Sequence, residues 1–270
     1  MPHSELTTNE KIVAMSDVFM QNLEKYCILK GYRGSIAHNT YEEKVTGDDK
    51  DIMGIIVPPP DIVFGINNME TIERMWEQKL SQKRTVVWDA VYYTVPKFLR
   101  LLLKQNPNVI MMLWLKEKHY LKRTKWGRLL IDNRDKLLSK QCYQSFCGYA
   151  HGQIHRATHP AFGRMGKKRK ELFAKVGYDS KNLSHCIRLL KMGLETLTTA
   201  EMIVERPDNN MLLDIKRGEW EYQRILDYAD KLFGLLDEAL VKSPLRAKVD
   251  DSLVNDLCME IVRGFYKEEE

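Results

Sequence analysis

The sequence contains no long hydrophobic run. Its longest apolar stretch, VIMMLWL at 109–115, is far shorter than the roughly 20 residues that cross a bilayer. The first residues, MPHSELTTNEK, lack the apolar segment of a secretory signal. We therefore expect a cytoplasmic protein with no membrane-spanning segment.

Closely spaced cysteines are also lacking, because none of the cysteines forms a C-x-x-C pair. This spacing argues against a disulfide framework and against a zinc ribbon. The cysteines stand at positions 27, 142, 147, 186 and 258. We expect them to be reduced thiols, most of them buried.

The composition is that of an ordinary folded protein. The 270 residues are 44% hydrophobic and 29% charged, which excludes a disordered chain and allows one or two domains. The net charge of +5 is modest, but basic residues are dense at 116–128 and 164–170. Such tracts suit a polyanionic partner or are simply solvated surface.

The first third of the chain reads as mixed α and β structure. Apolar residues at helical spacing predict a helix over 9–26, and 68–80 is expected to be a loop or helix. The β-branched stretches predict strands at CILKGYRG (27–34), DIMGIIV (51–57) and RTVVWDAVYY (84–93).

From Val95 onward the pattern is helical. Thr94 and Asn106 precede Pro96 and Pro107, which favours capped helix starts over 94–105 and from 106. Further helices are expected near 126–138, 140–158, 181–200, 219–241 and 250–265, with 200–218 less regular. The fold class is therefore α+β, a mixed sheet with helices in an N-terminal domain (1–95) followed by a helical bundle (96–270).

The stretch GDDKDIMG carries carboxylates at the start of a strand. Side chains alternate along a strand, so Asp49 and Asp51 project to one side while Asp48 and Lys50 project to the other. Two such carboxylates repel each other, and a divalent cation removes that cost. Mg²⁺ prefers a few carboxylates together with nucleotide phosphates. The alternative is a solvated acidic turn.

Two further features strengthen the metal interpretation. Asp89 interrupts an apolar strand and shares a face with Val87 and Val91, so it needs a partner or a metal unless it lies on a wet edge strand. Gly34 and Ser35 follow a predicted strand, where exposed N–H groups and a hydroxyl can hold phosphate oxygens, although most Gly-Ser pairs are turns.

The motifs RGSIAH, DKDIMGI and the aspartate of VVWDAVYY resemble the G-S, D-x-D, D signature of the DNA polymerase beta nucleotidyltransferase superfamily. They are most similar to the branch associated with RNA repair and RNA ligase genes in bacteria and phages. Later blocks also resemble that branch: KFLRLLLKQNPNVIMML, KKRKELFAKVGYDSKNLSHCIRLLKMGLETL and IVERPDNNMLLDIKRGEW. Together they cover most of residues 30–220.

The resemblance implies a metal-dependent nucleotidyltransferase. An acceptor hydroxyl would attack the α-phosphate of a nucleoside triphosphate, and pyrophosphate would leave. Asp49 and Asp51 would hold two Mg²⁺ ions, with Mn²⁺ as a possible substitute, and Asp89 would bind the catalytic ion and help deprotonate the acceptor. Gly34 and Ser35 would hold the β and γ phosphates. The helical domain would close the cleft and bind the acceptor.

A helical segment, GYDSKNLSHCIRLLKMG, adds candidates for nucleotide binding. Lys181, His185 and Arg188 stand at i, i+4 and i+7, so they share one helical face. That face suits a triphosphate or an acceptor strand. The alternative is an ordinary amphipathic helix.

A second stripe has metal-ligand chemistry but unsuitable spacing. Cys147, His151, His155 and His159 recur every four residues, so along one helix they span roughly 18 Å, too far for one tetrahedral zinc site. Two of them could bind zinc with ligands from elsewhere. We favour partly exposed polar residues near the acceptor path.

The expected function is transfer of a nucleoside monophosphate to an RNA end, such as a damaged tRNA. The same chemistry can modify a protein or small-molecule hydroxyl, as in toxin-like relatives. A non-catalytic RNA-binding protein of the same fold is the alternative outside catalysis. Nucleotide preference, templating and oligomeric state are left open.

Overall fold

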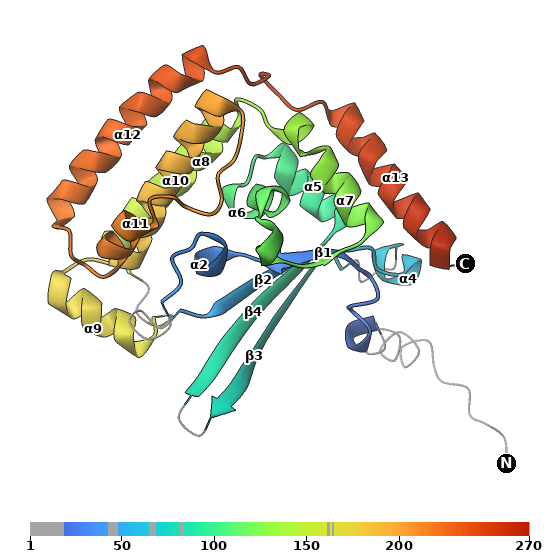
Figure 1. The fold of residues 1–270 in the computed structure, drawn as a ribbon, viewed down its shortest axis with the longest axis horizontal. Coiled ribbons are helices and arrows are strands. Elements are labelled where there is room, and N and C mark those ends of the chain that lie inside the picture. The colour runs from blue at the N-terminus through green and yellow to red at the C-terminus, as the bar shows by residue number, and fades with distance from the viewer. Residues whose placement is uncertain are drawn as a thin grey trace.

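A computed structural model describes residues 19–42, 48–64, 69–81, 84–160, 163 and 165–269. Figure 1 shows a twisted sheet with helices stacked over one of its faces and a two-stranded ribbon that projects from the body. Among the described residues, no helix is both long and apolar enough to span a membrane.

The described strands form a five-stranded sheet in the order β3-β4-β2-β1-β5. Strands β2 and β4 are parallel, and the other neighbours are antiparallel. The strands are β1 (Cys27–Tyr32), β2 (Lys50–Ile56), β3 (Thr71–Ser81), β4 (Arg84–Thr94) and β5 (Tyr120–Arg123). The strands predicted near 27, 51 and 84 are confirmed.

Strand β3 replaces the loop or helix predicted over 68–80, so that prediction is wrong. Because every residue from Glu73 to Ser81 is exposed, neither face of this segment is covered. The alternation of apolar and polar residues that marks a half-buried strand is therefore not needed there. The segment is a strand because its backbone pairs with β4 along the ribbon. Pairing across the sheet overrides the weak local preference.

The helices fill most of the chain after β4, as predicted. They are α2 (Gly34–Ala37), α4 (Pro60–Phe64), α5 (Val95–Leu103), α6 (Pro107–Ile110), α7 (Lys125–Asp132), α8 (Cys142–Thr158), α9 (Lys167–Val176), α10 (Ser180–Thr199), α11 (Asn209–Lys216), α12 (Tyr222–Lys242) and α13 (Asp251–Glu269), with the 3₁₀ turns η1 (Met111–Trp114), η2 (Glu117–His119) and η3 (Arg134–Leu137).

The predicted caps are present at the starts of α5 and α6. The Thr94 hydroxyl accepts a hydrogen bond from the Lys97 N–H, and the Asn106 side chain accepts one from the Asn108 N–H. In the same way Asp179 caps α10 by accepting from the Asn182 N–H. These caps supply partners for backbone N–H groups that the first turn of a helix leaves unpaired.

Four local predictions differ from the structure. Strand β5 lies in the half expected to be helical and pairs with β1. The irregular segment 200–218 contains helix α11, and α9 forms within a tract read only as basic surface. Of the helix predicted over 9–26, residues 9–18 lie outside the described part, and 22–26 form turns.

The two faces of the sheet have separate cores because side chains alternate along each strand. Met53 and Val91 belong to the large core beneath the helices. Ile52 and Ala90 belong to a smaller core with Phe19 on the opposite face. The predicted α+β fold is confirmed, and the domain boundary at residue 95 stays a prediction.

Candidate active site

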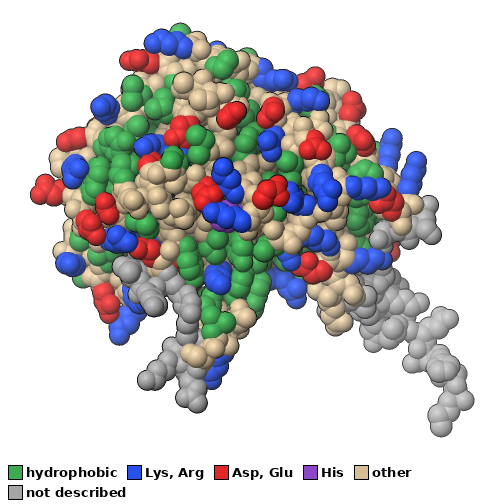
Figure 2. All heavy atoms as spheres, viewed as in Figure 1, with side chains coloured by type: hydrophobic (Ala, Val, Ile, Leu, Met, Phe, Trp, Pro, Cys, Tyr) green, Lys and Arg blue, Asp and Glu red, His purple; other side chains and the backbone are tan. Residues whose placement is uncertain are grey.

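The parallel pairing of β2 and β4 brings two predicted acidic residues side by side. Asp51 and Asp89 are register partners, so their side chains leave the same face of the sheet from adjacent strands. Asp49 precedes β2 and lies within electrostatic range of Asp89. Asp49, Asp51 and Asp89 therefore lie within electrostatic range of one another near the start of β2. Figure 2 shows acidic, basic and histidine side chains where the ribbon joins the body.

Arg33 supplies a positive charge between two of these carboxylates. Its Nη2 donates to Asp89 Oδ2 at 3.0 Å and lies 3.9 Å from Asp51 Oδ1. Sequence reasoning missed this residue. Its position at the end of β1, directly before Gly34-Ser35, was the available signal.

The acidic groups carry an electrostatic cost. Burial, with Asp89 adding to it against the opposing effect of Arg33, raises the pKa of Asp51 to about 6. Burial is also the main cause that raises the pKa of Asp49, to which Asp48 and Asp89 add. Both carboxyls are therefore held in an environment that disfavours their charge.

Gly34 is required by its contact with Asp51. Its φ of +60° lies in the left-handed region, and a Cβ there would stand 2.2 Å from Asp51 Oδ2. Only glycine allows the backbone to approach the carboxylate this closely. Ser35 follows in the short helix α2, and the segment is fixed by Thr40, whose N–H donates to the Ser35 carbonyl at 2.8 Å.

Lys181, His185 and Arg188 all face this region from α10, as their spacing predicted. Lys181 Nζ donates to Asp48 Oδ1 at 3.2 Å. His185 and Arg188 line the cavity beside Ser35. Burial, together with the positive charges of Arg188 and Lys181, holds the pKa of His185 well below its usual value, so its imidazole is neutral at pH 7.

Arg188 is a buried cation that has no carboxylate partner among the described residues. Its side chain donates to His38 Nε2 at 2.8 Å and contacts Met192 Sδ at 3.3 Å, and its Nε has no hydrogen-bond partner there. Burial, and to a lesser extent Arg206, lowers the pKa of Arg188 to about 9. A buried guanidinium without an acid is costly unless an anion completes it.

His38 fixes this guanidinium. Its Nδ1 bonds the Val204 carbonyl at 2.9 Å, so Nδ1 carries the proton and Nε2 is the acceptor for Arg188. Burial and the neighbouring Arg188 hold the pKa of His38 well below its usual value. The histidine therefore orients Arg188 without neutralising its charge.

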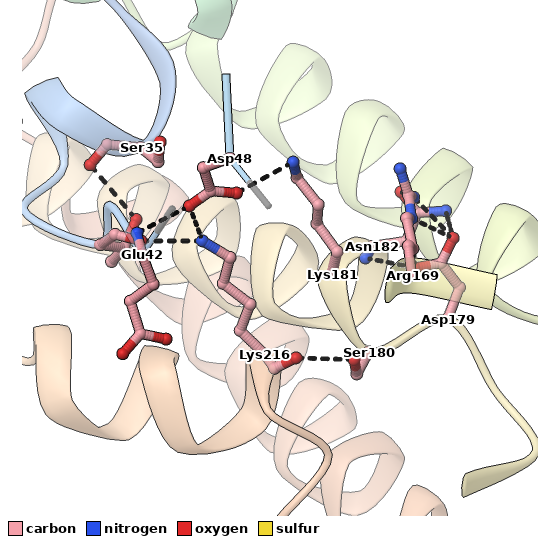
Figure 3. A network of polar contacts seen from close by, with 10 residues as sticks. Ser35, Glu42, Asp48, Arg169, Asp179, Ser180, Lys181, Asn182 and Lys216 are labelled. Carbon is pink, nitrogen blue, oxygen red and sulfur yellow. Dashed lines mark hydrogen bonds and ion pairs between the residues drawn. The ribbon is translucent and has the colours of Figure 1, made fainter. Parts of the chain in front are cut away.

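Asp48, read from the sequence as pointing away from the site, is buried in an ionic network that sequence reasoning missed. Lys216 Nζ donates to its Oδ2, and the Glu42 N–H donates to the same oxygen at 3.0 Å. Figure 3 shows Lys181 and Lys216 pointing at Asp48 from two helices. No local pattern relates Lys216 to Asp48, because the two are 168 residues apart.

Two cavities adjoin the acidic residues, and Arg33 lines both. The first, of about 260 Å³, is lined by Arg33, Gly34, Ser35, His38, Thr40, Asp51, Asn108, Met111, Gln153, Ser184, His185, Arg188, Leu212 and Lys216. The second, of about 310 Å³, is lined by Arg33, Glu73, Arg74, Met75, Asp89, Val91 and Tyr93. Asp51 thus faces one cavity and Asp89 the other.

The donor set near the start of β2 fits a hard divalent cation. Asp49, Asp51 and Asp89 offer carboxylate oxygens, the ligands that Mg²⁺ takes in proteins. Within the described residues, no group of three or more His, Cys, Asp or Glu side chains is already arranged around a common point. The role of the three aspartates as metal ligands stays a prediction.

The Cys147, His151, His155 and His159 stripe has other contacts. His151 stacks on Phe233 at a ring distance of 4.3 Å, and His155 stacks on His159 at 4.5 Å. Cys147 is buried among apolar side chains. All five cysteines of the chain are free thiols.

Comparison with known proteins adds a family match. The model of the RNA repair pathway DNA polymerase beta family matches residues 28–257. Among solved structures, the chain is similar to a nucleotidyltransferase-like protein from Exiguobacterium sibiricum 255-15, with 9% identity, a TM-score of 0.30, and coverage of 95% of this chain and 78% of that chain. No curated protein matches the chain.

We expect Asp51→Asn to stabilise the metal-free protein at neutral pH. The pKa of Asp51 is raised from 3.8 to about 6, so the folded protein binds this proton more tightly than the unfolded chain does. The stabilisation of the folded state by this proton is complete below about pH 4 and is lost as the pH rises through about 6. With 28% of the side chain exposed, solvent screening limits the expected gain to about 1 kcal/mol at neutral pH. Urea unfolding of both proteins in EDTA from pH 4 to 8 measures it, with the exposed Asp256→Asn as control. A difference that does not grow with pH would contradict this explanation.

We expect Arg188→Met to weaken binding of inorganic tripolyphosphate about 10-fold to 100-fold, because a charge-assisted hydrogen bond is lost. The free energy of unfolding should stay the same or rise, since an uncompensated buried charge is removed. Arg206 is the matched contrast, because it is buried with Glu195 and Asp208 as partners. Arg206→Met should cost about 3–5 kcal/mol of stability. Calorimetric titration and urea unfolding measure both quantities, and unchanged tripolyphosphate affinity in Arg188→Met would refute an anion site.

Proposed function

The chain belongs to the RNA repair pathway DNA polymerase beta family, and we propose that it is a Mg²⁺-dependent nucleotidyltransferase that acts on an RNA end. The observation that carries the proposal is that Asp51 and Asp89 are register partners that line two different cavities, with Arg33 lining both. A transferase for two substrates needs such an arrangement, because donor and acceptor must reach the same reacting atoms from different sides.

The first cavity suits the triphosphate of a nucleotide. Ser35 offers a hydroxyl near Asp51, and Arg188 adds positive charge to the same wall. Arg188 has no carboxylate partner within the described residues, so phosphate oxygens would supply the missing negative charge. This supports the roles predicted for Gly34, Ser35, His185 and Arg188, with Lys181 acting from the edge through Asp48.

The second cavity suits the acceptor. Asp89 lines it together with Met75 and Tyr93, so a hydroxyl-bearing group bound there would lie beside a carboxylate. In the proposed reaction the acceptor oxygen attacks the α-phosphorus, the bond from that phosphorus to the bridging oxygen breaks, and pyrophosphate leaves. Asp89 accepts the hydroxyl proton as the new bond forms.

Asp49, Asp51 and Asp89 would hold the metal, either Mg²⁺ or Mn²⁺. Two such ions, when bound, neutralise the phosphates and stabilise the entering and leaving oxygens. The raised pKa values of Asp49 and Asp51 support this assignment, because carboxyls whose charge is disfavoured gain most from a cation.

RNA is the preferred acceptor because the family is described by RNA repair. Of the two basic tracts, the one at 116–128 has three of its basic residues in ion pairs: Lys118 with Glu205, Arg123 with Glu117, and Lys125 with Glu268. Helix α9 presents exposed Lys167, Lys168, Lys170 and Lys175 on one short stretch, and Lys167 also pairs with Glu171 within the helix. We therefore propose α9 as the surface that contacts the RNA backbone.

A labelled-nucleotide assay tests the function. Each labelled NTP is incubated with Mg²⁺, bulk tRNA and the protein, and we expect label on RNA that disappears in EDTA. Asp89→Asn should lower the rate about 10²-fold to 10⁴-fold, the usual contribution of a general base. The exposed Asp256→Asn is the matched control. No labelled RNA, or equal transfer by Asp89→Asn, would refute the proposal, and label on proteins when extract replaces RNA would favour the protein-modifying alternative.

Charge reversal on α9 tests the RNA surface. Lys167→Glu with Lys170→Glu should weaken tRNA binding about 10-fold or more near 0.1 M salt and reduce the dependence of log K on log[salt] by about 1 for each lost phosphate contact. Lys231→Glu, an exposed lysine on α12, is the control. An unchanged salt slope in the α9 variant would exclude this helix from RNA binding.

A further inference from the structure

Lys216 is a buried cation that the proposed reaction does not fully explain. It lies at the end of α11, and its side chain is 3% exposed. The ammonium donates to Asp48 Oδ2 and, at 2.8 Å, to the Thr40 carbonyl. A buried ion pair of this kind is weak evidence for stability, because desolvation of both charges offsets their attraction. The contacts of its ammonium group indicate a role other than stabilising the fold.

The ammonium of Lys216 joins two segments of the active site. One contact holds Thr40, whose N–H in turn holds the Ser35 carbonyl at 2.8 Å. The other holds Asp48, which directly precedes Asp49 in the chain. Ser35, the predicted phosphate-binding residue, is thus linked to Lys216 Nζ through Thr40. Asp49, a predicted metal ligand, is linked to the same nitrogen through Asp48.

The helical part of the chain fixes the position of Lys216. Its own carbonyl accepts a hydrogen bond from Ser180 Oγ at 2.7 Å, at the start of α10. Asp48 is further held by Lys181 at 3.2 Å, one residue along the same helix. Figure 3 shows Asp48 held by Lys181 and Lys216, and Lys216 joined in turn to Ser180.

We infer that Lys216 is a positioning residue, which with Asp48 sets the Ser35 segment and the Asp49 segment in register with each other. The inference rests on the proposed function, because those segments are assigned there to phosphates and metal. Lys216 acts through its neighbours, since a displacement of either segment would misalign the nucleotide relative to the acceptor. A misplacement of about 1 Å can cost about 100-fold in rate.

Lys216→Met and the double variant Lys216→Met/Asp48→Asn separate positioning from stability. The single variant leaves Asp48 buried with one of its cations lost, and its melting temperature should fall. The double variant removes both charges of the pair, so its melting temperature should recover. Because neither variant anchors the Thr40 carbonyl, we expect kcat/KM to stay about 100-fold low in both, with a higher KM for the NTP and a lower kcat.

Lys191→Met is the matched control, because Lys191 also pairs with an aspartate, Asp208 at 2.6 Å, but lines neither of the two cavities. It should keep the wild-type kcat and KM below its melting temperature. Recovery of kcat/KM together with melting temperature in the double variant would overturn the inference, as would wild-type kinetics in Lys216→Met.

Tripolyphosphate binding by calorimetry distinguishes this inference from the proposed function. If the wild type transfers no nucleotide, the proposed function fails, but weaker tripolyphosphate binding in the double variant than in Lys191→Met still supports positioning. Equal tripolyphosphate binding by the double variant and Lys191→Met would refute positioning whether or not the wild type transfers nucleotide.

Discussion

The structure depends on one strand pairing. Parallel alignment of β2 with β4 sets Asp51 directly beside Asp89, and two carboxylates at neighbouring positions of a sheet repel each other. Arg33 counters that repulsion from the end of β1, and Gly34 follows because no side chain fits against the Asp51 carboxylate. Asp51 then lines one cavity and Asp89 the other.

The positive charge of the site comes mostly from the helical half of the chain. Arg188 and Lys181 lie on α10, and Lys216 lies on α11. Arg188 is buried without an acid among the described residues, whereas Arg206 is buried with two. The charge of Arg206 is therefore compensated within the fold, whereas no carboxylate of the described residues compensates that of Arg188. The strands therefore carry the acidic residues and the helices carry most of the basic ones, with Arg33 at the end of β1 as the exception.

The sequence predicted the secondary structure where local chemistry is strong. Strands rich in β-branched residues, and helices that begin at Thr94 and Asn106, lie where their patterns indicated. Strand β3 was missed because an exposed ribbon strand carries no alternation, and α9 was missed because a basic helix with little buried surface has no apolar stripe. The resemblance to the polymerase beta superfamily, carried by short motifs, is confirmed by the family match over residues 28–257.

By itself the sequence determined which residues of α10 share a face and the family of the chain, because these depend on periodicity and on residues close together in the chain. Only the tertiary structure decided the partners of those residues. Arg33 between two aspartates, His38 against Arg188, and Lys216 on Asp48 are contacts between segments distant in sequence. The physical reason is that a strand or helix pattern fixes the direction of a side chain, whereas the charge that meets it is set by how the sheet and the helices pack together.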